Sequence, residues 1–184
     1  MDKLLLEYPW LPKIVSLAKD HGLDWLMMAC LALELSNGDP RCRTLDHSFL
    51  INELGESATD LAVHDQWVKV PTGIDEEVGL APEVAIYDRA TRWGLFQILG
   101  EVAIGRGIFT GRMINFTDIG ANTRAACLLA QDIINKGGTL NDIINYFGAD
   151  PVRVLRLMDE SRRSIMLLLD LTHVATSEEE LEQA

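Results

Sequence analysis

Glu34 ends the longest apolar run of the sequence, which extends from Trp25 to Leu33. On a helix it would share its face with Met27, Cys30 and Leu31, because residues three, four and seven apart lie together. Burial on this face and the negative end of the helix dipole both disfavour the ionised form. We therefore expect a carboxyl that can donate a proton near neutral pH, as cleavage of a glycosidic bond requires. The alternative is a helix-end glutamate turned to solvent.

A second group of residues, 93–100, places one amide inside an apolar stretch with the sequence Trp-Gly-Leu-Phe-Gln-Ile-Leu-Gly. We expect Gln97 near the start of a helix from Leu95 to about Ile104, where its amide could bind an N-acetyl or hydroxyl group. Trp93 offers a flat face for a sugar ring, and Gly94 allows close approach of the backbone. The alternative is a core helix with one exposed glutamine.

The elements that must position these residues are predicted to be mostly helices. Asp24 and Thr139 are typical N-cap residues, and Asp150 before a proline marks the start of the last helix. Helices are expected over Pro9–His21, Trp25–Ser36, a short stretch through Leu54 capped by Asp46 or Ser48, Leu95–Ile104, Asn122–Lys136, Thr139–Phe147, and from Asp150 to about Val174. The last of these has Val154, Leu155 and Met158 on its apolar side.

The glycine-rich stretch from 55 to about 90 is predicted to be an irregular loop or small β wing. The fold class is therefore mainly α, with one domain over residues 1–176 and an acidic tail over residues 177–184.

The chain has 184 residues, with 16 Lys and Arg against 28 Asp and Glu, which gives a net charge of −12. Such a charge disfavours binding to nucleic acid and attraction to anionic membranes or wall polymers. Residues 1–7 are not expected to be a secretory signal, and no apolar run approaches the length of a membrane span. Three cysteines at irregular spacing indicate neither a disulfide framework nor a metal site. No cofactor is expected.

Together, Glu34-Leu35-Ser36, the block 93–100 and Asn145-Tyr146-Phe147-Gly148 resemble the lysozyme-like peptidoglycan hydrolases. The resemblance is closest to soluble lytic transglycosylase-like domains and phage N-acetylmuramidases. The stretch 45–49 is also similar to the Phe-Glu-x-His-x-Phe patch of the muramidases. The sequence departs from the family pattern where Leu35 precedes Ser36 and where arginines stand at 89 and 92.

The resemblance implies a lysozyme-like fold that cleaves the glycan strand of peptidoglycan, with Glu34 as general acid and base. It places Trp93, Gln97, Tyr146 and Ser36 in substrate binding. A lytic transglycosylase needs one carboxylate, whereas a muramidase can use a second. Asp46 is the first candidate for that second carboxylate, beside Asp39 and Asp65, and each is also explained as a cap or turn residue.

A wall-cleaving protein without an export signal must be carried to the wall. We therefore expect a phage protein made in the host cytoplasm, mounted on the virion with other virion proteins and acting at the bacterial wall. Two alternatives stay open from the sequence. One is a virion structural or assembly protein that keeps the fold with little or no catalysis, and the other is a helical protein-interaction module.

Overall fold

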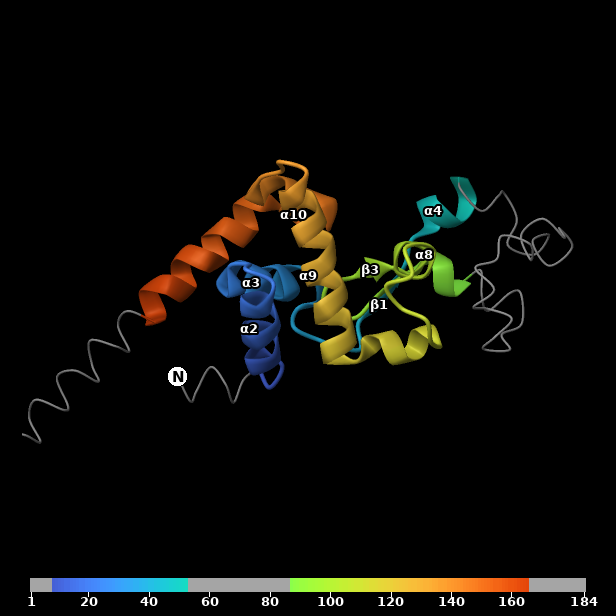
Figure 1. Ribbon diagram of the computed structural model, residues 1–184, viewed down its shortest axis with the longest axis horizontal. Helices are drawn as coiled ribbons and strands as arrows, with labels where there is room; N and C mark the ends of the chain where they lie inside the picture. The colour runs from blue at the N-terminus through green and yellow to red at the C-terminus, as the bar shows by residue number, and fades with distance from the viewer. Residues whose placement is uncertain (1–7, 53–86, 166–184) are drawn as a thin grey trace, which may run out of the picture.

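The computed structural model describes residues 8–52 and 87–165, which form a mainly helical structure with one small sheet (Figure 1). The helices are α2 (Leu11–Asp20), α3 (Trp25–Ser36), α4 (His47–Asn52), α8 (Gly100–Gly105), the 3₁₀ helix η1 (Met113–Thr117), α9 (Ile119–Asn135) and α10 (Leu140–Tyr146). Residues 87–90 and 151–165 are also helical. Antiparallel strands β1 (Arg43–Leu45), β2 (Thr91–Trp93) and β3 (Ile98–Leu99) form the sheet in that order.

The predicted mainly α class is confirmed for the described residues, whereas the lysozyme-like identity of the fold stays a prediction. Three predicted features lie wholly or largely outside the described residues. They are the irregular wing, of which only residues 87–90 are described and are helical, the acidic tail 177–184, and the last helix beyond residue 165.

Helix α3 is the most buried element of the described structure and begins and ends where the sequence predicts. Asp24 caps it by accepting a hydrogen bond from the backbone N–H of Leu26 at 2.8 Å. Every residue from Leu26 to Ala32 is buried. A helix that is apolar on all sides must be surrounded by other elements. Helix α2 packs against it, and α9 packs against α2 (Figure 1).

The second helical part also follows its local sequence signals. Thr139 forms a capping box with Asp142 at the start of α10, and Asp150 accepts a hydrogen bond from the N–H of Val152 at 2.9 Å. In the helical segment 151–165 that follows, Val154 and Met158 are buried as predicted. The structure corrects Leu155, which the sequence placed on the same apolar side and which is 39% exposed.

The predicted helix from Leu95 to Ile104 is wrong in its first half. Residues 94–97 form a tight turn between β2 and β3, and α8 begins only after β3. Gly94 and Gln97 have φ angles of +73° and +47°, which lie in the left-handed region and are incompatible with an α-helix. Both apolar residues between them are fully buried. A short apolar run is compatible with either a buried helix or a buried turn, so the pattern alone could not separate the two.

Asn122 on α9 holds this turn in place. Its side-chain Oδ1 accepts a hydrogen bond from the N–H of Phe96 at 3.0 Å, and its Nδ2 donates to the carbonyl of Trp93 at 2.9 Å. Asn122 is fully buried. A Cβ atom at Gly94 would lie 2.6 Å from Cγ of Asn122, so only glycine fits there. The turn is therefore joined to α9 as well as to its own strands.

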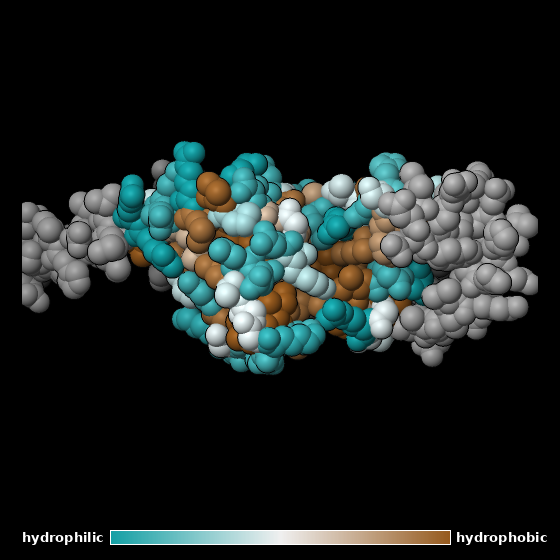
Figure 2. All heavy atoms as spheres, turned by 90° about the horizontal axis from the view of Figure 1, so that it is seen from above, coloured by the Kyte–Doolittle hydropathy of each residue, from teal (hydrophilic) through white to brown (hydrophobic). Residues whose placement is uncertain are grey.

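The surface carries apolar side chains between polar regions, as the middle of the face in Figure 2 shows. Among the described residues, the exposed large apolar side chains are Tyr87, Ile114, Leu128, Ile134, Tyr146, Val152 and Leu155. Within residues 8–52 and 87–165, no helix combines the length and the apolar character needed to cross a membrane.

Candidate functional site

Glu34 lies in the last turn of α3, and its side chain is only 10% exposed. This burial agrees with its predicted place on the apolar stripe, since Cys30 and Leu31 beside it are 1% and 0% exposed. Its Oε1 lies 3.2 Å from Nη1 of Arg153. The side chain is therefore not turned to open solvent. Arg153 would have to move away before this carboxyl could donate a proton.

Arg153 belongs to the helical segment 151–165, which runs antiparallel to α3. The pair of Arg153 with Glu34 joins the start of this segment to the end of α3. Near the other end of the segment, Arg162 lies 3.5 Å from Asp24, the cap at the start of α3. Because Arg153 is 70% exposed, it covers the Glu34 carboxyl from the solvent side and has room to change rotamer.

Gln97 is held by the turn rather than by a helix, which corrects its predicted setting. Its Nε2 donates to the carbonyl of Cys42 at 3.1 Å and to that of Gly94 at 2.8 Å, and the residue is 5% exposed. Both amide hydrogens are therefore used. Its Oε1 accepts no hydrogen bond from the described residues, so this oxygen is the group that Gln97 can offer to a ligand.

Trp93 is a core residue, and the structure corrects the prediction that its face is open to a sugar ring. It is 4% exposed, and its indole N–H donates to the carbonyl of Asp88 at 3.0 Å. The guanidinium of Arg43 lies 5.7 Å from the centre of the ring. Arg43 is directly opposite Trp93 in the pairing of β1 with β2, so this cross-strand neighbour covers the ring.

Ser36 is also turned inward, contrary to its predicted role in substrate binding. Its Oγ donates to the carbonyl of Ala32 one helical turn earlier, at 2.8 Å, and the residue is 7% exposed. Of the lesser carboxylate candidates, Asp39 accepts from the backbone N–H of Arg41 at 2.8 Å and is a turn residue. Asp65 lies outside the described residues.

Gln97 and Tyr146 are brought together in one pocket, which has a cavity volume of about 140 Å³. Tyr146 is 42% exposed, and Arg92 also lines the pocket. The pocket is completed by apolar side chains, namely Ile98, Leu99, Val102, Leu129 and Phe147. Pockets for drug-sized ligands measure about 300–1,000 Å³, so this one has room for a single sugar residue at most. The other predicted site residues do not line it.

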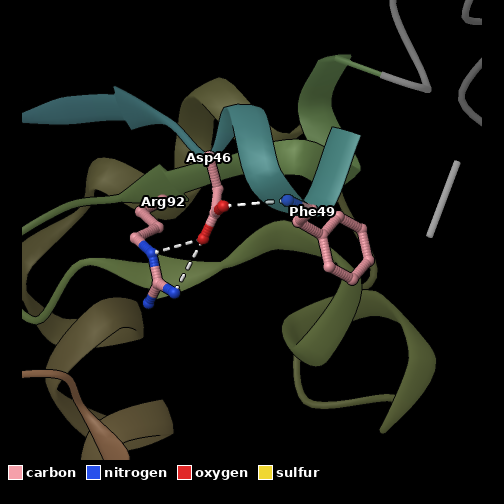
Figure 3. A network of polar contacts seen from close by, with 3 residues as sticks. All are labelled: Asp46, Phe49 and Arg92. Atoms are coloured by element: carbon pink, nitrogen blue, oxygen red, sulfur yellow. Dashed lines mark hydrogen bonds and ion pairs between the residues drawn. The ribbon is translucent and has the colours of Figure 1, made fainter. Parts of the chain in front are cut away.

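Asp46, the candidate second carboxylate, is already engaged by three donors (Figure 3). Its Oδ1 accepts from the N–H of Phe49 at 3.0 Å, and its Oδ2 accepts from Nε and Nη2 of Arg92 at 3.1 and 2.8 Å. The Phe49 N–H above all, and then Arg92, hold the pKa of Asp46 below its usual value despite its partial burial. Asp46 therefore caps α4 and fixes Arg92 at the pocket, and it is not free to activate water.

The buried thiols are unsuited to nucleophilic chemistry. Burial raises the pKa of Cys30 to about 11 and that of Cys127 to about 12, so both stay protonated at neutral pH. Within the part of the chain that the structure describes, no group of three or more His, Cys, Asp or Glu side chains could hold a metal ion.

Three residues that position the site were not identified as such from the sequence. In the sequence, Arg92 stands out only as a departure from the pattern of the resembled family, and Asn122 only as the first residue of a predicted helix. A buried asparagine on an apolar helix face is the signal that could have identified Asn122. No local signal could have paired Arg153 with Glu34, since the two are far apart in sequence.

No protein-family model, no curated protein and no solved structure matches this chain significantly. No family is therefore assigned. The lysozyme-like resemblance depends on the motif residues of the sequence alone.

Proposed function

We propose that this domain cleaves the glycan strand of peptidoglycan, with Glu34 as its general acid. The observation that carries the proposal is the setting of this carboxyl, which ends an apolar helix, is 10% exposed and is paired with one arginine that is 70% exposed. A buried carboxyl that is covered by an exposed arginine side chain could face a glycosidic oxygen once that arginine moves, which is the position that a general acid requires.

In the proposed reaction, Glu34 protonates the oxygen between N-acetylmuramic acid and N-acetylglucosamine as the bond from that oxygen to the anomeric carbon breaks. The positive charge that develops on the sugar is stabilised by its own N-acetyl group. The Glu34 carboxylate then accepts a proton from the attacking hydroxyl. If that hydroxyl is the muramic 6-hydroxyl, an anhydro ring closes, and if it is water, a reducing end forms.

The transglycosylase route agrees better with the setting of Asp46. A muramidase that uses a second carboxylate would need one with free oxygens, whereas both oxygens of Asp46 accept hydrogen bonds within the protein. The route through an anhydro ring requires Glu34 alone.

The net charge of −12 supports attachment to a virion as the means of delivery. An acidic protein gains no electrostatic attraction to an anionic wall. Mounting on a particle would instead supply a high local concentration at the substrate. The same chain would then contact other virion proteins.

A second candidate function is a virion structural protein without catalysis. The Arg153–Glu34 ion pair and the covered face of Trp93 favour it, because both occupy groups that a glycosidase would present to its substrate.

Clearing of peptidoglycan in a gel overlay separates the two candidates. The wild-type chain should clear the gel, and Glu34→Gln should not, while the matched control Glu160→Gln, which alters an exposed ion pair, should clear like the wild type. Mass spectrometry of the released fragments should find anhydro ends. Absence of clearing on walls of several chemical types would eliminate the enzymatic proposal.

A further inference from the structure

Arg92 presents unused hydrogen-bond donors at the pocket it shares with Gln97 and Tyr146. A guanidinium carries five N–H donors, and Asp46 takes two of them. The other three, two on Nη1 and one on Nη2, have no acceptor among the described residues. Figure 3 shows the third nitrogen pointing away from Asp46. The side chain of Arg92 is 36% exposed, so these donors can be reached by a ligand.

The position of Arg92 is fixed before any ligand arrives. Asp46 binds it through two nitrogens and is itself anchored by the N–H of Phe49 at the start of α4. Arg92 also pairs with Leu99 across β2 and β3, and Leu99 lines the same pocket. A guanidinium that is already oriented loses less conformational entropy on binding than a free one.

The other polar group of the pocket is an acceptor. Gln97 uses both amide hydrogens within the protein, so its Oε1 can only receive a hydrogen bond. The pocket therefore combines a donor of positive charge, a neutral acceptor, a phenol and an apolar wall. Its complement is a ligand with an anionic group, an N–H group and a small apolar substituent close together.

We infer that this pocket binds an acetamido sugar whose neighbouring substituent carries a free carboxylate, with Arg92 binding the carboxylate and Gln97 accepting from the acetamido N–H. N-acetylmuramic acid has both groups on adjacent ring carbons. In strands that carry stem peptides its carboxyl is an amide without charge. The inference, which depends on the proposed function for its substrate class, is that the site prefers strands from which the peptides have been removed.

Titration of the full chain by NMR tests this directly. The Glu34→Gln variant serves as the non-cleaving form, and the probes are N-acetylmuramic acid and the primary amide of its lactyl group. We expect the acid to bind about tenfold more tightly than the amide, as a charge-assisted hydrogen bond implies. Adding Arg92→Gln should abolish the difference by weakening the binding of the acid, and Arg92→Lys should restore part of it.

Two further variants separate positioning from folding. Asp46→Asn keeps a good N-cap but removes the charge that holds Arg92, so it should reduce the preference without abolishing it. Arg106→Gln, which alters a surface pair with Asp132, should leave the preference intact. Thermal unfolding of each variant checks that the fold is unchanged. Equal affinity for acid and amide, no binding of either, or a preference that survives Arg92→Gln would each overturn the inference.

Cleavage assays distinguish this inference from the proposed function. Peptide-free and peptide-bearing strands are offered to the chain with Glu34 intact, and faster cleavage of the peptide-free strands supports both. Cleavage at equal rates overturns the inference and leaves the proposed function standing. Preferential binding of N-acetylmuramic acid without cleavage of either kind of strand supports the inference and overturns the proposed function.

Discussion

Glu34 and Asp46, the two carboxylates proposed for catalysis, each pair with an arginine, and the two pairs differ in which partner is buried. In the Glu34–Arg153 pair the carboxylate is 10% exposed and the arginine is 70% exposed. In the Asp46–Arg92 pair the two values are 20% and 36%, and the carboxylate accepts three hydrogen bonds. The first pair thus joins a buried carboxyl to an exposed cation. The second pair uses a fully engaged carboxylate to fix a cation, and only the Glu34 carboxyl is proposed to transfer a proton.

The largest expected difference between the two pairs is in catalysis. Glu34→Gln should lower the rate of fragment release from peptidoglycan by at least about 100-fold, because general acid catalysis contributes roughly 10²–10⁴-fold. Asp46→Asn should lower the same rate by less than about tenfold, since it only loosens Arg92. Equal losses in the two variants would show that Asp46 takes part in the chemistry.

Replacing Arg153, the exposed cation of the Glu34 pair, should change the rate of cleavage by a smaller factor and in the opposite direction. Arg153→Gln should raise the rate of cleavage by up to about fivefold, because an exposed ion pair contributes up to about 1 kcal/mol. Added salt should raise the wild-type rate and leave that of the variant unchanged. Arg156→Gln, on the same helical segment, is the matched control. A rate that falls in Arg153→Gln would mean that this arginine assists the reaction.

For the free energy of unfolding, the Asp46–Arg92 pair should matter more than the Glu34–Arg153 pair. Asp46→Ala removes the cap of α4 and the partner of Arg92, and we expect it to lower the free energy of unfolding by about 1–2 kcal/mol. Arg153→Ala should lower it by less than about 1 kcal/mol. Chemical denaturation at neutral pH measures both. A larger loss of unfolding free energy in Arg153→Ala than in Asp46→Ala would contradict the view that Arg153 is held only by an exposed ion pair.

The smallest expected effect is on the pH dependence of stability. The pKa of Asp46 is lowered in the folded state, so its contribution is fully present above the ordinary aspartate value of 3.8 and is lost as pH falls through the folded pKa. The difference in unfolding free energy between wild type and Asp46→Asn should stay constant from about pH 7 to 5 and shrink below about pH 4. A difference that grows in acid would rule out a stabilising Asp46 anion.

The features that could be predicted from the sequence are those that depend on contacts between residues close together in the chain. Asp24, Asp46 and Thr139 were identified as caps or cap candidates because a cap bonds to residues two or three positions away. Residues 95–97 of the turn were predicted as helix because the polar partner of the turn, Asn122, lies on a distant helix. The Trp93 ring was expected to be open because its cover, Arg43, comes from another strand.

The candidate site was predictable to a similar extent. The burial of Glu34 follows from the apolar stripe of its own helix, and its partner Arg153 depends on the tertiary packing of a segment far along the chain. Gln97 and Tyr146 were both selected from the sequence and share a pocket. Arg92, the charged member of that pocket, is held by a side chain from another element, so no local pattern could assign its role.

The two hydrogen bonds of Asn122 have a consequence for how the molecule opens. Since the N–H of Phe96 is bonded to a side chain of α9, this amide can exchange with solvent only when the turn separates from that helix. Native-state hydrogen exchange of the Phe96 amide should therefore report how often the turn separates from α9. Gln97 follows Phe96 in the same turn, so the Phe96 amide is a probe of how firmly the position of Gln97 is kept.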